Sequence, residues 1–276
     1  MNRTDMLPAT LSALLRDNSV SDGIQMAERL VRKNPARAAC RHSLFQLLCI
    51  TGDWPRALQQ LQLCARMDAN YTQEARLFRE LVRCEMFRQS VFQGTQRPGF
   101  ILPQPVWTES LLDALACEAR SEIQEADQHR NTALETISDT CGRWNGGSFD
   151  WVSDSDSRLG PVLEVVTGGE YIWLPFSQIR SLETPFPVRL TDLLWKPVNI
   201  TLVNGDLHGA WLFTRYSGSG NASDALRLCR ETVWQDGPGE TTVQAQGQKV
   251  WLSSHGDISL LDLTTCTFHE AKGPAV

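Results

Sequence analysis

Residues 44–61 of this chain read LFQLLCITGDWPRALQQL, and this stretch predicts two short helices separated by a turn. The first helix is expected to end at Thr51–Gly52, because glycine readily adopts the left-handed conformation that often follows a helix. Asp53 can cap the next helix, and Pro55 is tolerated in its first turn. Apolar residues recur at helical spacing on both sides of the turn: Leu44, Phe45, Leu47 and Leu48 before it, and Ala57, Leu58, Leu61 and Ala65 after it.

The unit is repeated in the preceding residues. Corresponding positions lie 34 residues apart: Leu11 and Phe45, Leu14 and Leu48, Asn18 and Gly52, Gly23 and Ala57, Ala27 and Leu61, Pro35 and Ala69. This period is typical of tetratricopeptide repeats, in which each helix pair buries its apolar face against the next pair. A third helix is predicted at about Thr72–Phe92, but Gly94 and three prolines within residues 97–105 prevent a matching partner. The pattern therefore predicts an incomplete array with a curved surface for another polypeptide.

Beyond the array, helical periodicity continues and then gives way to strands. Thr108 is a candidate N-cap of one more helix, and an acidic helix through Ile137 follows it. Seven of the nine tryptophans lie beyond residue 140, among short alternating runs separated by turn residues. We therefore expect a helical domain over residues 1–142 and a β-rich domain over residues 143–276.

Three hairpins are predicted in the second part, and the Asn204–Gly205 turn is the clearest signal among them. The paired strands are Val162–Thr167 with Glu170–Pro175, Val198–Val203 with Asp206–Phe213, and Lys249–Leu252 with Ile258–Leu263; Thr232–Trp234 and Thr242–Gln246 are further candidates. The predicted fold class is α+β, a tetratricopeptide-like array followed by a small antiparallel sheet or partly open barrel of five to eight short strands.

Charge divides the chain unevenly. Residues 1–100 hold 14 Lys and Arg against 9 Asp and Glu, a balance of +5, whereas residues 101–276 hold 12 against 23, a balance of −11. The arginines are dispersed and interleaved with acids, with no lysine-rich tract or run of stacking aromatics, so a nucleic-acid surface is not indicated. Arginines that receive an acidic or polar peptide fit the first half better.

The eight cysteines and the hydropathy indicate a cytoplasmic protein. No CxxC pair occurs, and most of the cysteines sit among apolar helical positions. Asp5 and Pro8 interrupt any secretory signal, and no eighteen uncharged apolar residues run together, so membrane insertion is not expected.

Motifs for catalysis, metal or cofactor binding are incomplete. The Gly218–Gly220 segment lacks the third glycine and the lysine of a phosphate-binding loop. Asp154, Asp156 and Arg158 are spaced as in a calcium loop, but arginine occupies the third ligand position and Val165 the twelfth. No two histidines are three or four residues apart, and no candidate base neighbours a nucleophile. We therefore expect no catalytic residue, metal or cofactor.

Two blocks of sequence resemble the ImpE/TagJ family, also called SciE, of type VI secretion accessory proteins. The first block comprises Leu44–Cys49, Gly52–Trp54, Arg56–Ala57 and Leu61; the second comprises Phe149–Trp151, Asp154, Asp156–Glu164, Trp173, Pro175–Phe176, Asp192–Leu193 and Trp195. The second block contains the motif residues Asp154, Asp156, Arg158, Gly160 and Pro161, to which no role is assigned. The resemblance implies a non-enzymatic cytoplasmic adaptor that binds the N-terminal region of the small contractile-sheath subunit and helps to connect the sheath, directly or indirectly, with the ClpV unfoldase.

The repeat register also suggests where such a partner binds. Superposing the 34-residue units places seven polar residues on the inner helices: Ser12, Arg16, His42, Gln46, Arg76, Glu80 and Arg83. A solvated helix face is the alternative for each of them. Two other functions stay open, an enzyme or ligand-binding protein that uses the acidic β-rich part, through Asp154, Asp156, Arg158, His208 or His255, and a scaffold outside secretion.

Overall fold

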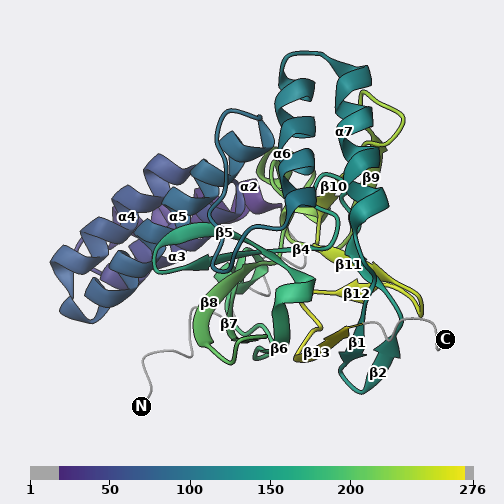
Figure 1. The fold of residues 1–276 in the computed structure, drawn as a ribbon. Coiled ribbons are helices and arrows are strands. Elements are labelled where there is room, and N and C mark those ends of the chain that lie inside the picture. The colour runs from purple at the N-terminus through teal and green to yellow at the C-terminus, as the bar shows by residue number, and fades with distance from the viewer. Residues whose placement is uncertain (1–18, 271–276) are drawn as a thin grey trace.

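The computed structural model describes residues 19–270 and places the long helices before the strands (Figure 1). Six helices have more than one or two turns: α2 (Val20–Lys33), α3 (Ala38–Ile50), α4 (Trp54–Met67), α5 (Thr72–Phe92), α6 (Val106–Ala119) and α7 (Ile123–Thr136). The expected helix through Leu11 and Leu14 lies outside the described residues. None of the helices within residues 19–270 is long and apolar enough to cross a membrane.

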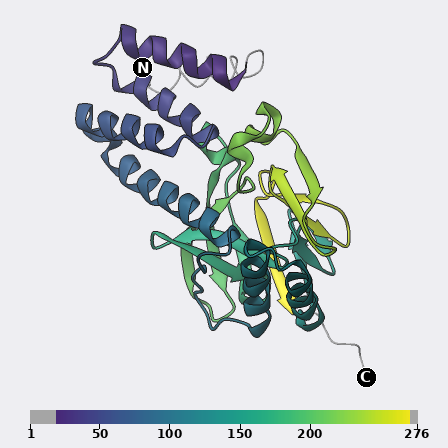
Figure 2. The same cartoon turned by 90° about the horizontal axis from the view of Figure 1, so that it is seen from above.

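Helices α2 to α5 form the array, each packed against the next along the chain. Figure 2 shows them side by side, with α2 on the side farthest from α6 and α7. The turn between α3 and α4 is formed as predicted, because Gly52 has a φ of 72° and the Asp53 side chain accepts a hydrogen bond from the Arg56 amide. The expected cap at Thr108 is wrong: the N-cap is Pro105, three residues earlier, and the Thr108 hydroxyl donates to the Pro105 carbonyl.

Thirteen strands follow within the described residues. They are β1 (Thr140–Trp144), β2 (Gly147–Phe149), β3 (Val152–Asp154), β4 (Val162–Thr167), β5 (Glu170–Pro175), β6 (Ile179–Glu183), β7 (Trp195–Leu202), β8 (Leu207–Phe213), β9 (Thr232–Asp236), β10 (Val243–Gly247), β11 (Val250–Ser253), β12 (Ile258–Ser259) and β13 (Thr265–Glu270). Eight of them form an antiparallel sheet in the order β2-β1-β13-β6-β7-β8-β4-β5. Strands β9 and β10 form a ribbon, and β12, β11 and β3 form a third sheet.

The α+β class is confirmed, and the predicted hairpins correspond to β4–β5, β7–β8 and β11–β12. Gly168 and Gly169 both have positive φ, 59° and 76°, which the tight turn between β4 and β5 requires. The main sheet is open and is not a closed barrel, because β2 and β5 lie at its two edges. The described residues contain more strands than the five to eight expected, since β1, β2, β3, β6 and β13 were not predicted, and the strand expected at Ile258–Leu263 ends at Ser259.

One apolar core joins the array to the sheet. The ring centre of Trp195 on β7 lies 5.9 Å from that of Phe78 on α5 and 5.7 Å from that of Trp54 on α4. Trp195 is fully buried, and the same core includes residues of α3 and β8. A second core covers the other face of the sheet, around Trp251 and Phe176. The array is therefore packed against the sheet through aromatic side chains.

Helices α6 and α7 form an antiparallel pair that projects from the sheet (Figure 1). The pair is fastened to the loop between β9 and β10. The Asp127 carboxylate accepts hydrogen bonds from the amides of Glu240 and Thr241, and the Arg130 guanidinium donates to the hydroxyls of Thr241 and Thr242. These contacts fix the direction of the projection.

Candidate functional site

The buried face of α5 carries an arginine that pairs with the sheet. Arg88 Nε lies 2.6 Å from Glu164 Oε1 on β4, and Nη2 lies 2.8 Å from Oε2. Both side chains are at most 1% exposed. The same guanidinium also donates to the Arg215 carbonyl and lies 4.4 Å from the ring centre of Phe213. A bidentate geometry of this kind fixes both partners in direction as well as in distance.

A buried lysine extends the pair to the family motif. Lys249 Nζ lies 2.6 Å from Glu164 Oε2 and 2.8 Å from Asp154 Oδ2, and all three side chains are fully buried. Each carboxylate also accepts a phenol hydroxyl, Glu164 from Tyr171 at 2.5 Å and Asp154 from Tyr216 at 2.9 Å. We call these residues, Arg88, Glu164, Lys249, Asp154, Tyr171 and Tyr216, the charge network.

The two carboxyls of the charge network have opposite pKa shifts. Burial alone would raise the pKa of Glu164, but the charges of Arg88 and Lys249 outweigh it and hold that pKa well below its ordinary value. Burial raises the pKa of Asp154 to about 6, against the opposing charge of Lys249. Glu164 is thus the anion that two cations share.

The remaining motif residues close a loop over the sheet. Arg158 forms a bidentate pair with Asp156 at 2.8 and 2.5 Å, and Asp156 also accepts the Ala245 amide at 3.1 Å. Gly160 has a φ of 59°, and the Pro161 carbonyl accepts from Phe176. Lys249 pairs with Asp154, and Arg158 pairs with Asp156. The two acids of the calcium-like spacing are therefore already neutralised by cations of this chain. Nowhere in residues 19–270 do three His, Cys, Asp or Glu side chains gather as metal ligands.

The charge network and the motif loop hold α5 and the strands together. Among their residues, no nucleophile is paired with a base. Neither His208 nor His255 bonds to the charge network; His255 Nδ1 lies 2.8 Å from the Ser254 hydroxyl in an exposed turn. Hydrogen bonds and ion pairs within the motif loop and to Lys249, Tyr216 and Ala245 therefore use the polar atoms that a reaction at Asp154, Asp156 or Arg158 would require.

The predicted groove residues fall into two groups. His42 on α3 joins its neighbours through both ring nitrogens, with Nδ1 3.0 Å from Gln46 Nε2 and Nε2 3.1 Å from Glu74 Oε2 on α5. This group spans the inner helices as the repeat register implies. Ser12 and Arg16 lie outside the described residues.

The second group forms a stripe on α5. Arg76, Glu80 and Arg83 are exposed and lie four and three residues apart, which places them on one helix face. Arg83 Nη2 donates to the Gly169 carbonyl at 2.6 Å, so the stripe leads to the β4–β5 turn. The sheet also packs on the array near α3, through the 3-10 helix η3 (Leu190–Leu193). Part of the predicted groove of the array is thus covered by η3 of the same chain.

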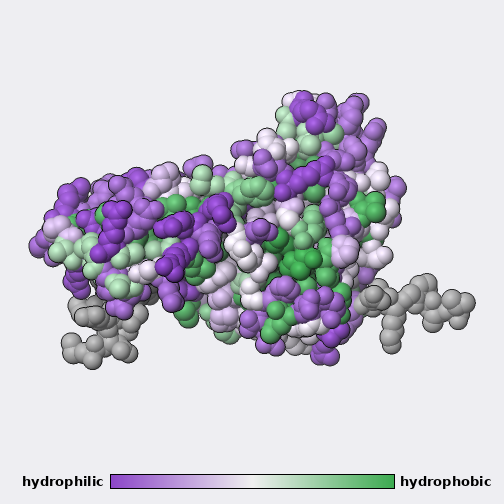
Figure 3. Space-filling model, turned by 60° about the vertical axis from the view of Figure 1, so that its left-hand side comes forward, coloured by the Kyte–Doolittle hydropathy of each residue, from purple (hydrophilic) through white to green (hydrophobic). Residues whose placement is uncertain are grey.

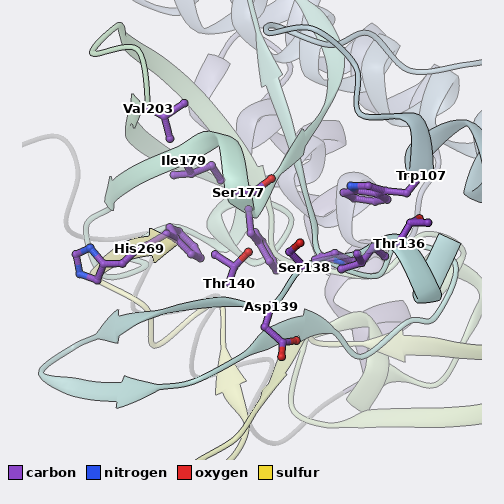
Figure 4. A pocket seen from close by; sticks show the side chains of 13 residues that line it. Trp107, Thr136, Ser138, Asp139, Thr140, Ser177, Ile179, Val203 and His269 are labelled. Atoms are coloured by element: carbon purple, nitrogen blue, oxygen red, sulfur yellow. The ribbon is translucent and has the colours of Figure 1, made fainter. Parts of the chain in front are cut away.

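A cavity of about 400 Å³ opens between the end of α7 and the strands β6 and β13. In Figure 4, Trp107 and Thr136 lie on one side of it and Ile179, Val203 and His269 on the other, with Ser177, Ser138 and Thr140 between them. Figure 3 shows hydrophobic residues gathered in the hollow below the projecting α6–α7 pair. The lining comes from six separate segments of the chain, so no local pattern predicts this cavity, although Pro161 and Phe176 belong to the second family block.

The charge network was also missed from the sequence, although signals for it exist. Glu85 and Arg88 continue the apolar face of α5 that contains Phe78 and Leu81, and Glu164 interrupts the apolar run of β4. Charged residues at such buried positions are rare unless they are paired. The sequence therefore indicates that these charged residues are paired in the interior, but it does not identify their partners.

Comparisons with known proteins agree with the resemblance of the two sequence blocks. Residues 146–267 match the family model described as ImpE protein. The type VI secretion system accessory component TagJ of Pseudomonas aeruginosa is 37% identical over 257 residues, which cover 92% of this chain and 89% of that protein. The crystal structure of a protein from Vibrio parahaemolyticus has a TM-score of 0.86 and 25% identity, covering 95% of this chain and 98% of that one.

Proposed function

This chain belongs to the ImpE/TagJ family, and on that premise we propose that it is a non-enzymatic adaptor of a type VI secretion system. Its partner is the small contractile-sheath subunit, whose N-terminal region it binds in the cytoplasm. Through this contact it helps to couple the sheath to the ClpV unfoldase. An accessory role in the secretion system follows from the family, whereas the sheath and ClpV contacts are the proposal.

The observation that carries the proposal is the extent of the likeness to TagJ. The 37% identity covers 92% of this chain, and so includes both the helical array and the sheet. A surface that needs both parts, such as the stripe of α5 beside the β4–β5 turn, can therefore be shared with the relative.

The array offers a half-buried and an exposed polar region to an amphipathic helix. His42 contacts Gln46 on its own helix α3 and Glu74 on α5, and Arg76 on the stripe makes no ion pair or hydrogen bond with any described residue. The excess of positive charge in residues 1–100 favours an acidic or polar partner segment. Helix recognition on a helical surface places apolar anchors every three or four residues, with charged residues at the rim.

The charge network supports a non-enzymatic role. Asp154, Asp156 and Arg158, which an enzyme would have to expose, are buried or nearly so and are bonded to one another, to Lys249 and to the backbone of β10. Catalytic groups need access to a substrate, and these groups have none.

Binding of the sheath subunit can be tested with the full chain. A labelled peptide with the sequence of the N-terminal helix of the small sheath subunit from the same organism should be retained at micromolar concentration. A scrambled peptide of the same composition should not be retained. Absence of retention for both peptides and for the intact subunit would contradict the proposal.

The ClpV contact is tested by size-exclusion chromatography of three mixtures. The chain is combined with ClpV alone, with the sheath subunit alone, and with both. A complex containing all three proteins is expected. Co-elution with ClpV alone would make the contact direct, and co-elution only in the presence of the subunit would make it indirect.

A further inference from the structure

Strands β6 and β13 separate at one end of the main sheet. Their ladder covers only Thr265–Thr267 of β13 and ends at the pair Thr267 and Ser181. Beyond it, Phe268 and His269 stay paired with β1, while β6 is irregular between Ile179 and Ser181. Two neighbouring strands thus diverge and leave a wedge between them.

The cavity described above occupies this wedge. Its floor is apolar, formed by Phe176, Ile179 and Phe268, and its rim carries the hydroxyl groups of Ser138, Thr140 and Ser177. A volume of about 400 Å³ falls at the lower end of the range for ligand sites. An apolar floor under a polar rim suits a single large side chain whose backbone stays at the surface.

The charge at the rim of the cavity indicates whether a bound segment would be positively or negatively charged. Asp139 is exposed at the mouth and makes no hydrogen bond or ion pair with any described residue. No lysine or arginine lines the cavity, and residues 101–276 have a net charge of −11. A free carboxylate in an acidic setting attracts a positively charged segment and repels an acidic one.

Apolar side chains of the lining reach the surface on both sides of the mouth. Trp107 is half-buried, and Val203 on the other side is 47% exposed. Figure 4 shows Trp107 and Val203 on opposite sides of the opening. The surface therefore provides contacts for residues before and after an inserted side chain.

We propose that this cavity binds a cationic peptide segment of a partner protein, with one large apolar side chain inserted between β6 and β13. The site lies between the α6–α7 pair and the main sheet, outside α2 to α5, and so goes beyond the proposed sheath contact on the array. Because the two sites are separate, loss of one leaves the other measurable.

The test uses fluorescence anisotropy with the full chain and three labelled heptapeptides. The first has phenylalanine at its centre and lysine or arginine at the flanking positions. The second has alanine at its centre, and the third has glutamate at the flanking positions. We expect the first to bind at least tenfold more tightly than either of the others, and to weaken as salt rises.

Two variants locate the binding. Ser177→Trp fills the cavity and should weaken the first peptide at least tenfold, whereas Ser148→Trp on β2, outside the lining, should not. Asp139→Lys should weaken it at least fivefold, with Asp257→Lys in an exposed turn as its matched control. Circular dichroism should show that all four variants fold like the parent chain.

Three results would overturn the inference. The first is that the alanine-centred or the glutamate-flanked peptide binds as tightly as the first peptide. The second is that the first peptide does not bind. The third is that Ser177→Trp binds the first peptide as tightly as the parent chain does. Sedimentation velocity adds a fourth: a dimer of the full chain that Ser177→Trp dissociates would make a second copy the occupant. Retention of the sheath peptide by Ser177→Trp separates failure of this site from failure of the proposed function.

Discussion

Arg88 on α5 and Glu164 on β4 face each other as a buried bidentate pair, with N–O distances of 2.6 and 2.8 Å. The two residues are 76 positions apart, and their pairing holds the last helix of the array on the sheet. Lys249 shares Glu164 with Arg88, so one carboxylate neutralises two cations. Removal of this anion should therefore have a larger effect than removal of either cation.

Glu164→Gln should lower the free energy of unfolding by about 3 to 5 kcal/mol, because it removes the bidentate partner of buried Arg88 and leaves Asp154 as the remaining partner of Lys249. Urea denaturation of the two proteins measures the change. Glu170→Gln, at an exposed position on the adjacent strand, should change the value by less than about 0.5 kcal/mol. Equal stability of Glu164→Gln and the parent would contradict a stabilising pair.

Asp154→Asn should alter how stability depends on pH. The folded pKa of about 6 lies above that of a free aspartate, so between these values the folded state keeps a proton that the unfolded state has lost. The contribution of Asp154 to stability therefore falls as pH rises through this window. Since asparagine does not titrate, the unfolding free energy of the variant minus that of the parent should rise by about 2 kcal/mol from pH ~4 to pH ~7.

Denaturation curves at several pH values measure this difference. Asp150→Asn, an exposed acid four residues earlier, is the control and should give a nearly constant difference. A constant difference for Asp154→Asn as well would show that Asp154 titrates like a free aspartate. Lys249, Tyr216 and Asp156 surround the carboxyl in both proteins, so their effects largely cancel.

The array and the sheet should unfold together. Trp195 contacts Trp54 and Phe78 across the junction, and the buried residues of α2 to α5 belong to the core that the array shares with the sheet. Tryptophan fluorescence and far-ultraviolet circular dichroism should therefore give coincident urea transitions. Two separated transitions would instead identify two independent domains.

Arg76→Glu should weaken retention of the sheath peptide without changing the fold. Arg76 is exposed and has no partner among the described residues, so its replacement removes a charge and leaves no buried group unpaired. We expect a loss of about threefold to tenfold in affinity, which isothermal titration calorimetry measures. Arg29→Glu on α2 is the matched control, and an equal loss there would indicate a general charge effect.

Arg83 is unsuited to the same test. Its guanidinium already donates to the Gly169 carbonyl, so a reversal of charge there disturbs the β4–β5 turn as well as the surface. A lost interaction in that variant would not distinguish a partner contact from a structural one.

Local signals were sufficient for much of the fold. The turn at Gly52 and Asp53 follows from capping rules, and the β4–β5 hairpin follows from two glycines between apolar runs. Both features depend on residues adjacent in the chain. The start of α6 was misplaced by three residues, because the N-cap is Pro105 and Thr108 bonds back to it from within the first turn.

Long-range partners could not be read from the sequence. The charge network joins Arg88, Glu164 and Lys249 across 76 and 85 positions, and no local pattern pairs them. The predicted groove has the same limitation, since the repeat register describes the helices alone. It does not show that η3 and Trp195 cover part of the inner face.

Within the described residues, β13 is the last strand in sequence order, and it lies between β1 and β6 in the interior of the main sheet. During synthesis, the ribosome must therefore add residues 265–270 before this sheet can close. A product that stops before residue 265 leaves two strand edges unpaired, and such edges recruit other chains. Copies that terminate before this strand should accordingly be removed by proteases or accumulate as inclusion bodies, so that only molecules containing β13 are available for assembly.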